Sequence, residues 1–126
     1  MKGKITIPYN TILSKNRMWR HGRGRTYINP ATKAEIGAIA MMLKAKRIHW
    51  NIGKLFVNVV VYRPDMRADP VNFLDAILDG VKVATGVDDR YYSGSWDWQL
   101  DKEKPRIEIT VWQEEEDERI HSHAHP

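Results

Sequence analysis

The sequence predicts an α+β fold in which two helices pack on a small mixed β-sheet. Two kinds of pattern support this prediction: segments with alternating polar and apolar residues, and two helix starts where a capping residue precedes proline, Asn29-Pro30 and Asp69-Pro70. The 126 residues are enough for one domain with a modest core and few for two. We therefore expect a domain over residues 1–113 and a tail over residues 114–126.

The first five predicted elements follow in chain order. Residues 2–8 (KGKITIP) alternate polar and apolar side chains, which predicts a strand that opens the sheet. Residues 9–25 have no sustained period and contain several asparagines and glycines, so they predict a long loop, which leads into a short strand at residues 26–28. Apolar residues at helical spacing predict a helix over residues 31–47. Residues 54–63 (KLFVNVVVYR) are rich in β-branched and aromatic residues and predict a central strand.

Three further elements complete the expected fold. An apolar stripe at spacing i, i+3, i+4, i+7 begins at Leu74 and stops before Gly86, which predicts a helix over residues 70–84. Residues 96–100 and 106–112 predict two closing strands with a turn between them.

The net charge of +4 conceals an uneven distribution along the chain. Residues 1–67 hold 14 Lys and Arg against 2 Asp and Glu, a net charge of +12, whereas residues 68–126 hold 6 against 14, a net charge of −8. A basic half and an acidic half fit a protein with one face that attracts phosphate and another that holds cations. Two ordinary solvated surfaces are the alternative.

Composition narrows the possible sites. The chain contains no cysteine, so a metal would be held by carboxylates, imidazoles or backbone oxygens, and carboxylates favour Mg²⁺ or Mn²⁺. No run approaches the ~20 apolar residues of a membrane span, and the first residues do not resemble a signal peptide. We expect a cytosolic protein with no membrane partner. The acidic, histidine-containing residues 114–126 predict a disordered tail.

A basic segment over residues 13–30 (LSKNRMWRHGRGRTYINP) combines cations, glycines and aromatics. Arg offers bidentate contacts to phosphate, and aromatic rings can stack on exposed bases. We interpret the segment as a nucleic-acid-binding surface, with a solvated basic loop as the alternative. Its candidate binding residues are Lys15, Arg17, Trp19, Arg20, Arg23 and Arg25.

An acidic segment over residues 67–89 carries the second candidate function. On a helix that begins at Pro70, the spacing i, i+3, i+7 places Asn72, Asp75 and Asp79 on one face. Asp69 lies at the helix entrance, and a pair of aspartates follows the helix end. Carboxylates held close together repel one another unless a cation lies between them. The candidate metal ligands are therefore Asp69, Asp75, Asp79, Asp88 and Asp89.

Each carboxylate also has a simpler explanation. Asp69 can serve only as an N-cap. Asp75 and Asp79 can be solvated, with Lys82 as an ion-pair partner. The last two aspartates can be turn residues.

Together the two segments resemble the RusA family of Holliday-junction resolvases. The matching features run in order through ITIP at residues 5–8, S-x-N-R with R-H-x-R-G-R-T-Y-I at 14–28, and R-x-D-x-x-N with D and G-V-D-D at 67–89. The resemblance implies a β-α-β-α-β order, a homodimer, and a Mg²⁺-dependent endonuclease, with Mn²⁺ able to substitute, that nicks paired strands of branched DNA in recombination and repair. It also implies a cytoplasmic enzyme of bacterial, prophage or phage origin.

The resemblance assigns roles to residues of the acidic segment. Asp69 matches the first acidic position of the family motif, Asn72 matches its Asn, and Asp89 matches the later catalytic aspartate. Two positions depart from the motif: Val71 stands where a second Asp is usual, and Asp75 where a Lys is usual. We hypothesise that Asp75 replaces the missing ligand, which makes Asp69, Asp75 and Asp89 the expected catalytic set. Arg67 and Asn72 join the expected DNA-binding residues.

Two other functions remain open from the sequence. One is a DNA-binding protein of the same descent whose catalytic site has decayed at Val71 and Asp75. The other is an RNA-binding sheet domain, which is disfavoured because the strand at residues 54–63 lacks closely spaced exposed aromatics.

Overall fold

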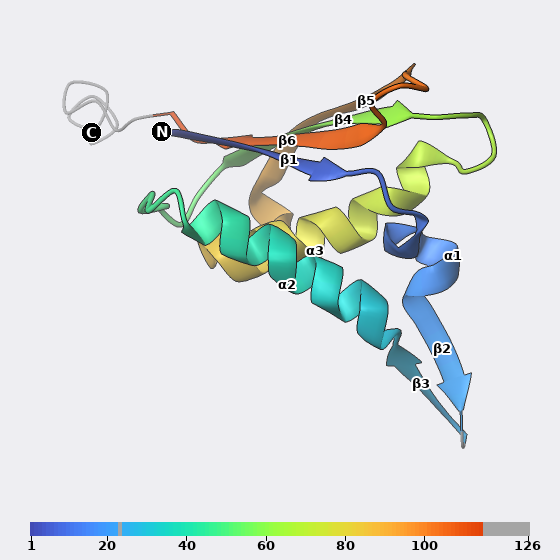
Figure 1. The fold of residues 1–126 in the computed structure, drawn as a ribbon. Coiled ribbons are helices and arrows are strands. Elements are labelled where there is room, and N and C mark those ends of the chain that lie inside the picture. The colour runs from blue at the N-terminus through green and yellow to red at the C-terminus, as the bar shows by residue number, and fades with distance from the viewer. Residues whose placement is uncertain (23, 115–126) are drawn as a thin grey trace, which may run out of the picture.

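The computed structural model describes residues 1–22 and 24–114 (Figure 1). Its strands are β1 (Lys2–Pro8), β2 (Trp19–Gly22), β3 (Arg25–Ile28), β4 (Leu55–Arg63), β5 (Tyr92–Leu100) and β6 (Arg106–Trp112). Its α-helices are α1 (Lys15–Met18), α2 (Pro30–Lys44) and α3 (Leu74–Thr85), and its 3₁₀ segments are η1 (Thr11–Leu13), η2 (Pro70–Phe73) and η3 (Asp89–Tyr91). The predicted α+β class is confirmed.

The main sheet is mixed and has the strand order β1-β6-β4-β5. β6 runs antiparallel to both β1 and β4, whereas β4 and β5 are parallel. The central position predicted for β4 is confirmed. The two closing strands are also present, but β4 lies between them, so the turn after β5 crosses the end of β4, where the Asp101 backbone N–H donates to the Arg63 carbonyl at 2.9 Å.

Helices α2 and α3 cover one face of this sheet and leave the other open (Figure 1). Along β4 every second residue is buried, which places one row of side chains in the core beneath the helices. The two helices approach each other closely at Gly80, where an added Cβ would lie 2.7 Å from Cγ2 of Ile39. A glycine at this position therefore sets the spacing of the helix layer.

Both predicted helix starts are confirmed, with one difference. Asn29 caps α2, because its side chain accepts a hydrogen bond from the backbone N–H of Ala31 at 3.1 Å. The Asp69 side chain accepts from the N–H of Val71 at 3.2 Å, but the turn that follows is the 3₁₀ segment η2, and α3 begins only at Leu74. The tighter winding of η2 changes the angle between Asn72 and the acidic residues of α3.

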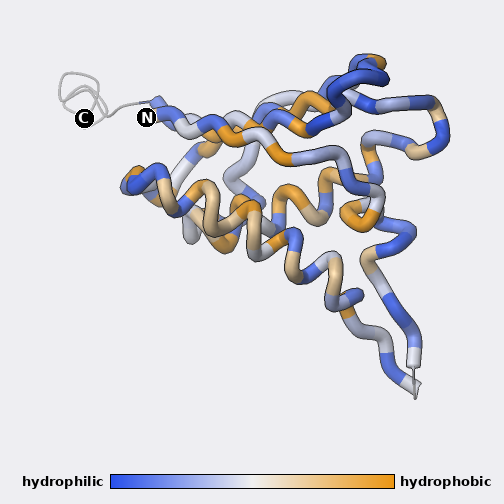
Figure 2. The backbone as a smooth tube through the Cα atoms, viewed as in Figure 1, coloured by the Kyte–Doolittle hydropathy of each residue, from blue (hydrophilic) through white to orange (hydrophobic). Residues whose placement is uncertain are grey.

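The prediction of a long loop over residues 9–25 was wrong. Side chains of Asn10 and Ser14 accept hydrogen bonds from backbone N–H groups two residues on, which starts η1 and α1. The chain then forms the hairpin β2–β3, whose residues are largely exposed. A strand that is polar on both faces shows no alternation, so periodicity could not reveal it. The hairpin is mostly hydrophilic and projects away from the sheet and helices (Figures 1 and 2).

Within residues 1–22 and 24–114, no helix is long and apolar enough to cross a membrane.

Candidate metal and DNA-binding site

Three of the predicted metal ligands line one pocket, which we call the acidic pocket. Its volume is about 280 Å³, and its acidic lining residues are Asp75 and Asp79 on α3 and Asp89 on η3. Asp75 and Asp79 are one helical turn apart, so their side chains lie on the same side of α3. Residues 86–88 connect α3 to η3, beginning with Gly86 in the left-handed conformation, and bring Asp89 beside them.

The ionised form of Asp79 is disfavoured by its position in the acidic pocket. Burial raises the pKa of its carboxyl, and the negative charges of Asp75 and Asp89 raise it further, whereas Lys82 acts in the opposite direction. A carboxylate whose ionised form is disfavoured by its neighbours is stabilised when a cation binds among them. The acidic pocket therefore has the charge distribution that favours a divalent ion.

Two lysines already pair with carboxylates at this end of the molecule. Lys15 of α1 lies 3.7 Å from Asp75, and both side chains are more than half exposed. Lys82 lies 3.9 Å from Asp88. Asp88 also caps η3 by accepting from the Arg90 backbone N–H, and this bond is the main cause that lowers the pKa of its carboxyl. Asp88 thus has a structural role beside the acidic pocket, which it does not line.

Asp69 lies in a different pocket, which we call the polar pocket. It has a volume of about 420 Å³ and is lined by Thr11, Ser14, Asn16, Arg17, Arg67, Ala68, Asp69 and Asn72. The structure therefore brings Asp75, Asp79 and Asp89 together and places Asp69 and Asn72 apart from them. Among the described residues, no three histidine or acidic side chains form a group that could hold a metal ion.

The acidic pocket still fits Mg²⁺ by the chemistry of its donors. Mg²⁺ in phosphate-processing sites usually takes one or two protein carboxylates and completes its shell with water and substrate phosphate oxygens. Asp75 and Asp79 supply two such carboxylates on one side of α3, and Asp89 lies across the same pocket. The hypothesis that Asp75 stands in for a ligand at position 71 places Asp75 with Asp69, whereas in the structure Asp75 shares its pocket with Asp79.

The basic hairpin is held at its base by Asn29, which is buried at 5% exposure. Besides capping α2, the Asn29 side chain donates to the Arg17 carbonyl at 3.1 Å, and its backbone N–H donates to the Met18 carbonyl at 2.7 Å. One residue thus fixes where the hairpin leaves the body of the protein. The ring of Trp19, at the start of β2, is 47% exposed and also lines the acidic pocket.

The remaining predicted DNA-binding residues lie on this side of the molecule. Arg20 and Arg25 are exposed on the two strands of the hairpin, and Arg17 and Arg67 line the polar pocket. Arg17 also donates to the Thr11 hydroxyl at 3.1 Å. The prediction for Arg23 falls outside the described residues.

Sequence reasoning missed three residues of the polar pocket: Thr11, Ser14 and Asn16. Ser14 and Asn16 belong to the S-x-N-R stretch, so a sequence signal existed for them, whereas nothing pointed to Thr11.

Arg63, at the end of β4, was also missed. It is buried at 4% exposure, and its guanidinium donates to the carbonyls of Asp65 and Ala68 and lies 4.8 Å from the ring centroid of Trp98. Because Ala68 immediately precedes Asp69, this buried cation holds the loop that leads into Asp69. An arginine at the end of an apolar strand gives no sequence signal for such a role.

No protein-family model matches the chain, and a search of curated proteins finds no match. Assignment to the RusA family therefore stays a prediction.

Proposed function

We propose that the protein is a Mg²⁺-dependent endonuclease of the RusA type that acts as a homodimer on branched DNA such as four-way junctions. The proposal depends on the observation that the basic hairpin and the acidic pocket meet at one residue. Trp19 belongs to the basic hairpin and also lines the acidic pocket. A phosphate backbone bound along the hairpin would therefore pass beside Asp75 and Asp79.

Each part of the site has a chemical task in this proposal. Asp75 and Asp79 would hold the ion, with Asp89 across the same pocket, and the ion would supply a Lewis acid and an activated water when bound. Arg17 and Arg67 in the polar pocket bind a neighbouring phosphate, because guanidinium groups match phosphate oxygens in pairs. The exposed ring of Trp19 stacks on a base at the branch point.

A second candidate function is binding of branched DNA without cleavage. Two observations favour it. The ammonium group of Lys15, 3.7 Å from Asp75, already supplies a cation next to the acidic pocket, and Asp69 lies in the polar pocket instead. In this function the carboxylates orient basic side chains and no ion is needed.

Cleavage of a labelled four-way junction in Mg²⁺ and in chelator separates the two functions. For the nuclease, the wild type and the control Glu103→Gln, an exposed residue of the turn after β5, cut only with Mg²⁺. Asp75→Asn and Asp79→Asn lose on the order of 100-fold in rate and retain binding. Binding by all proteins with no cutting in Mg²⁺ or Mn²⁺ would establish the second function.

Asp69→Asn tests the residue that lies apart. Asn caps a helix about as well as Asp, so the start of η2 is preserved. Because Asp69 lies in the polar pocket, apart from the proposed ion site, we expect this variant to bind and to cleave junctions like the wild type. Loss of cleavage with binding retained would add Asp69 to the catalytic residues. If binding and cleavage fall together, Asp69 has a structural role only.

A further inference from the structure

Strand β5 is an edge strand whose apolar face is partly exposed. Its register with β4 places Trp96 beside Val59 and Trp98 beside Val61, on the face where both valines are buried in the core. Trp96 nevertheless stays 44% exposed and Trp98 38% exposed, and Leu100 follows on the same face at 56%. Helices α2 and α3 do not extend far enough to cover this side of the sheet.

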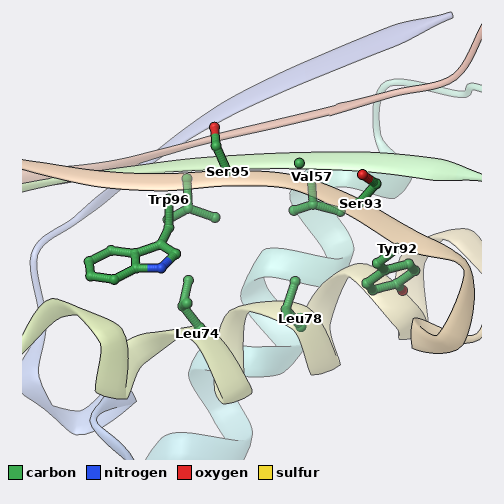
Figure 3. Close-up of a pocket in the computed structure, with 9 residues that line it drawn as sticks. Val57, Leu74, Leu78, Tyr92, Ser93, Ser95 and Trp96 are labelled. Atoms are coloured by element: carbon green, nitrogen blue, oxygen red, sulfur yellow. The ribbon is translucent and has the colours of Figure 1, made fainter.

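A groove runs between β5 and α3 along this face. It has a volume of about 280 Å³ and is lined by Val57, Val59, Leu74, Leu78, Tyr92, Ser93, Gly94, Ser95 and Trp96. Figure 3 shows Trp96 and Tyr92 pointing toward the helix side, with Leu74 and Leu78 below them, while Ser93 and Ser95 point to the open face of the sheet. The strand is thus apolar on the helix side and polar on the other.

An exposed edge strand presents unpaired backbone groups, and proteins usually protect such edges with lysines, prolines or short strands. β5 has nine residues (YSGSWDWQL) with neither lysine nor proline, and Asp97 is its one charged residue. Exposure of this kind on a long strand is typical of a surface that pairs with another strand.

We propose that β5 pairs antiparallel with β5 of a second copy of this chain, about a two-fold axis at Trp96, so that two four-stranded sheets join into one. This register is the one that pairs all nine residues, from Tyr92 opposite Leu100 to Trp96 opposite its own counterpart. Apolar residues then meet apolar residues on the helix side. Trp98 lies opposite Gly94, a position where an aromatic ring covers the exposed backbone of an edge glycine.

The position of the charged residue Asp97 favours the same register of the two β5 strands. With the axis at Trp96, Asp97 lies opposite Ser95 of the second copy, and both lie on the polar face. An axis one residue further along would place Asp97 directly opposite its own counterpart, and like charges directly opposite one another destabilise a strand pair. The sequence of β5 is therefore complementary to itself, which favours a second copy over a strand from an unrelated partner.

The proposed pairing deepens the proposed nuclease, because Leu78 lines both the groove and the acidic pocket. A dimer formed at β5 would carry two acidic pockets, each a short distance from the shared edge, as cutting of two strands requires. The pairing itself is measured without any reference to cleavage.

Sedimentation of the full chain tests the interface. We expect a dimer for the wild type and for the control Met41→Lys, which changes a more exposed apolar residue on α2, and a monomer for Trp96→Lys. Circular dichroism and thermal unfolding verify that each variant is folded. A wild-type monomer at high micromolar concentration, or a dimer that persists in folded Trp96→Lys, overturns the proposal. A dimer that fails to cut DNA contradicts the proposed function alone.

Cysteine pairing tests the register, because the chain contains no cysteine. Co-expressed Ser95→Cys and Asp97→Cys chains should form a disulfide-linked dimer on oxidation, since these positions face each other. Ser93→Cys alone should not, because its counterpart lies six residues away along the partner strand, beyond disulfide reach. A Ser93→Cys cross-link, or none from the mixed pair, overturns the pairing. If β5 instead binds a strand of another protein, the mixed pair stays unlinked and the purified chain is monomeric.

Discussion

At the scale of single residues, Asp79 reports on the acidic pocket. Its raised pKa means that the folded protein holds a proton there more tightly than the unfolded chain, whose carboxyl titrates near 3.8. Stability therefore falls as the pH rises through this range, and at neutral pH the ionised Asp79 destabilises the fold. We expect Asp79→Asn to raise Tm at pH 7.5 in chelator, with the gain shrinking as the pH falls below the raised pKa. Thermal unfolding across pH measures this.

In Mg²⁺ the wild type should have a higher Tm than Asp79→Asn, the reverse of the order expected in chelator. A ligand that binds the native state raises Tm with its concentration, so wild type should gain stability in millimolar Mg²⁺ and Asp79→Asn should gain less. The conservative variant Glu103→Gln, which leaves the acidic pocket intact, should respond like the wild type. Equal gains in all three proteins would show that the ion binds elsewhere.

Arg63 is the second residue whose role is testable alone. Its buried guanidinium contacts two loop carbonyls and an aromatic ring at once, a geometry that the single ammonium of lysine cannot match. We expect Arg63→Lys to lose about 2–4 kcal/mol in the free energy of unfolding. Urea unfolding measures it, with Arg67→Lys, an exposed residue of the same loop, as the control. A loss below 0.5 kcal/mol, roughly the effect of a surface change, would refute the role.

At the scale of elements, the parallel pairing of β4 and β5 depends on Gly94. This residue has φ +129°, and a Cβ added there would lie 2.1 Å from the carbonyl oxygen of Val57. Because that obstacle is backbone, the strands must separate to admit a side chain. We expect Gly94→Ala to lose at least about 3 kcal/mol in the free energy of unfolding.

Gly37 of α2 provides the matched control, since an added Cβ there meets no atom within 4 Å. Gly37→Ala should stabilise the protein by about 0.5–1 kcal/mol through helix propensity. Chemical unfolding compares the two. If both substitutions have the same sign, the close approach of β4 and β5 does not control stability.

The elements differ in how far the sequence predicts them. β1, β4 and β6 lie with one face on the core, so their alternation is visible in the residues, and the capped proline starts locate both long helices. The hairpin β2–β3 is exposed on both faces, so burial leaves no pattern in it. Strand pairing is also hidden, because nothing local tells β6 to lie beside β4 and not beside β5.

At the scale of the whole molecule, local sequence patterns likewise predict only part of the candidate site. Spacing on α3 correctly predicts that Asp75 and Asp79 lie together. The separation of Asp69 from them follows from the 3₁₀ winding of η2 and from α1 packing between the two pockets, and neither is encoded in local spacing. Charge segregation along the chain does predict that a basic and an acidic surface exist, since the hairpin and the acidic pocket come from opposite halves.

Because the basic hairpin lies beside the acidic pocket, we expect DNA affinity to depend on the position of each cation and not on the net charge of the protein. Binding that neutralises phosphates weakens as salt is raised, with a slope that falls by about 1 for each phosphate-contacting cation removed. We expect the double variant Arg20→Ala/Arg25→Ala to lower the slope for a labelled four-way junction by about 2. Fluorescence anisotropy in chelator, over a range of salt concentrations, measures it.

Lys102→Ala/Lys104→Ala, in the exposed turn after β5, removes the same two charges from the total of +4 and serves as the matched control. Its slope should equal that of the wild type, because these lysines lie in the turn that crosses the end of β4, outside the hairpin, and line neither the acidic pocket nor the polar pocket. Because the hairpin presents Trp19 as well as cations, the wild type should also prefer the junction over a duplex of equal length, and Trp19→Ala should reduce that preference without changing the slope. If both double variants lower the slope equally, DNA responds to net charge alone, and the hairpin is not the binding surface.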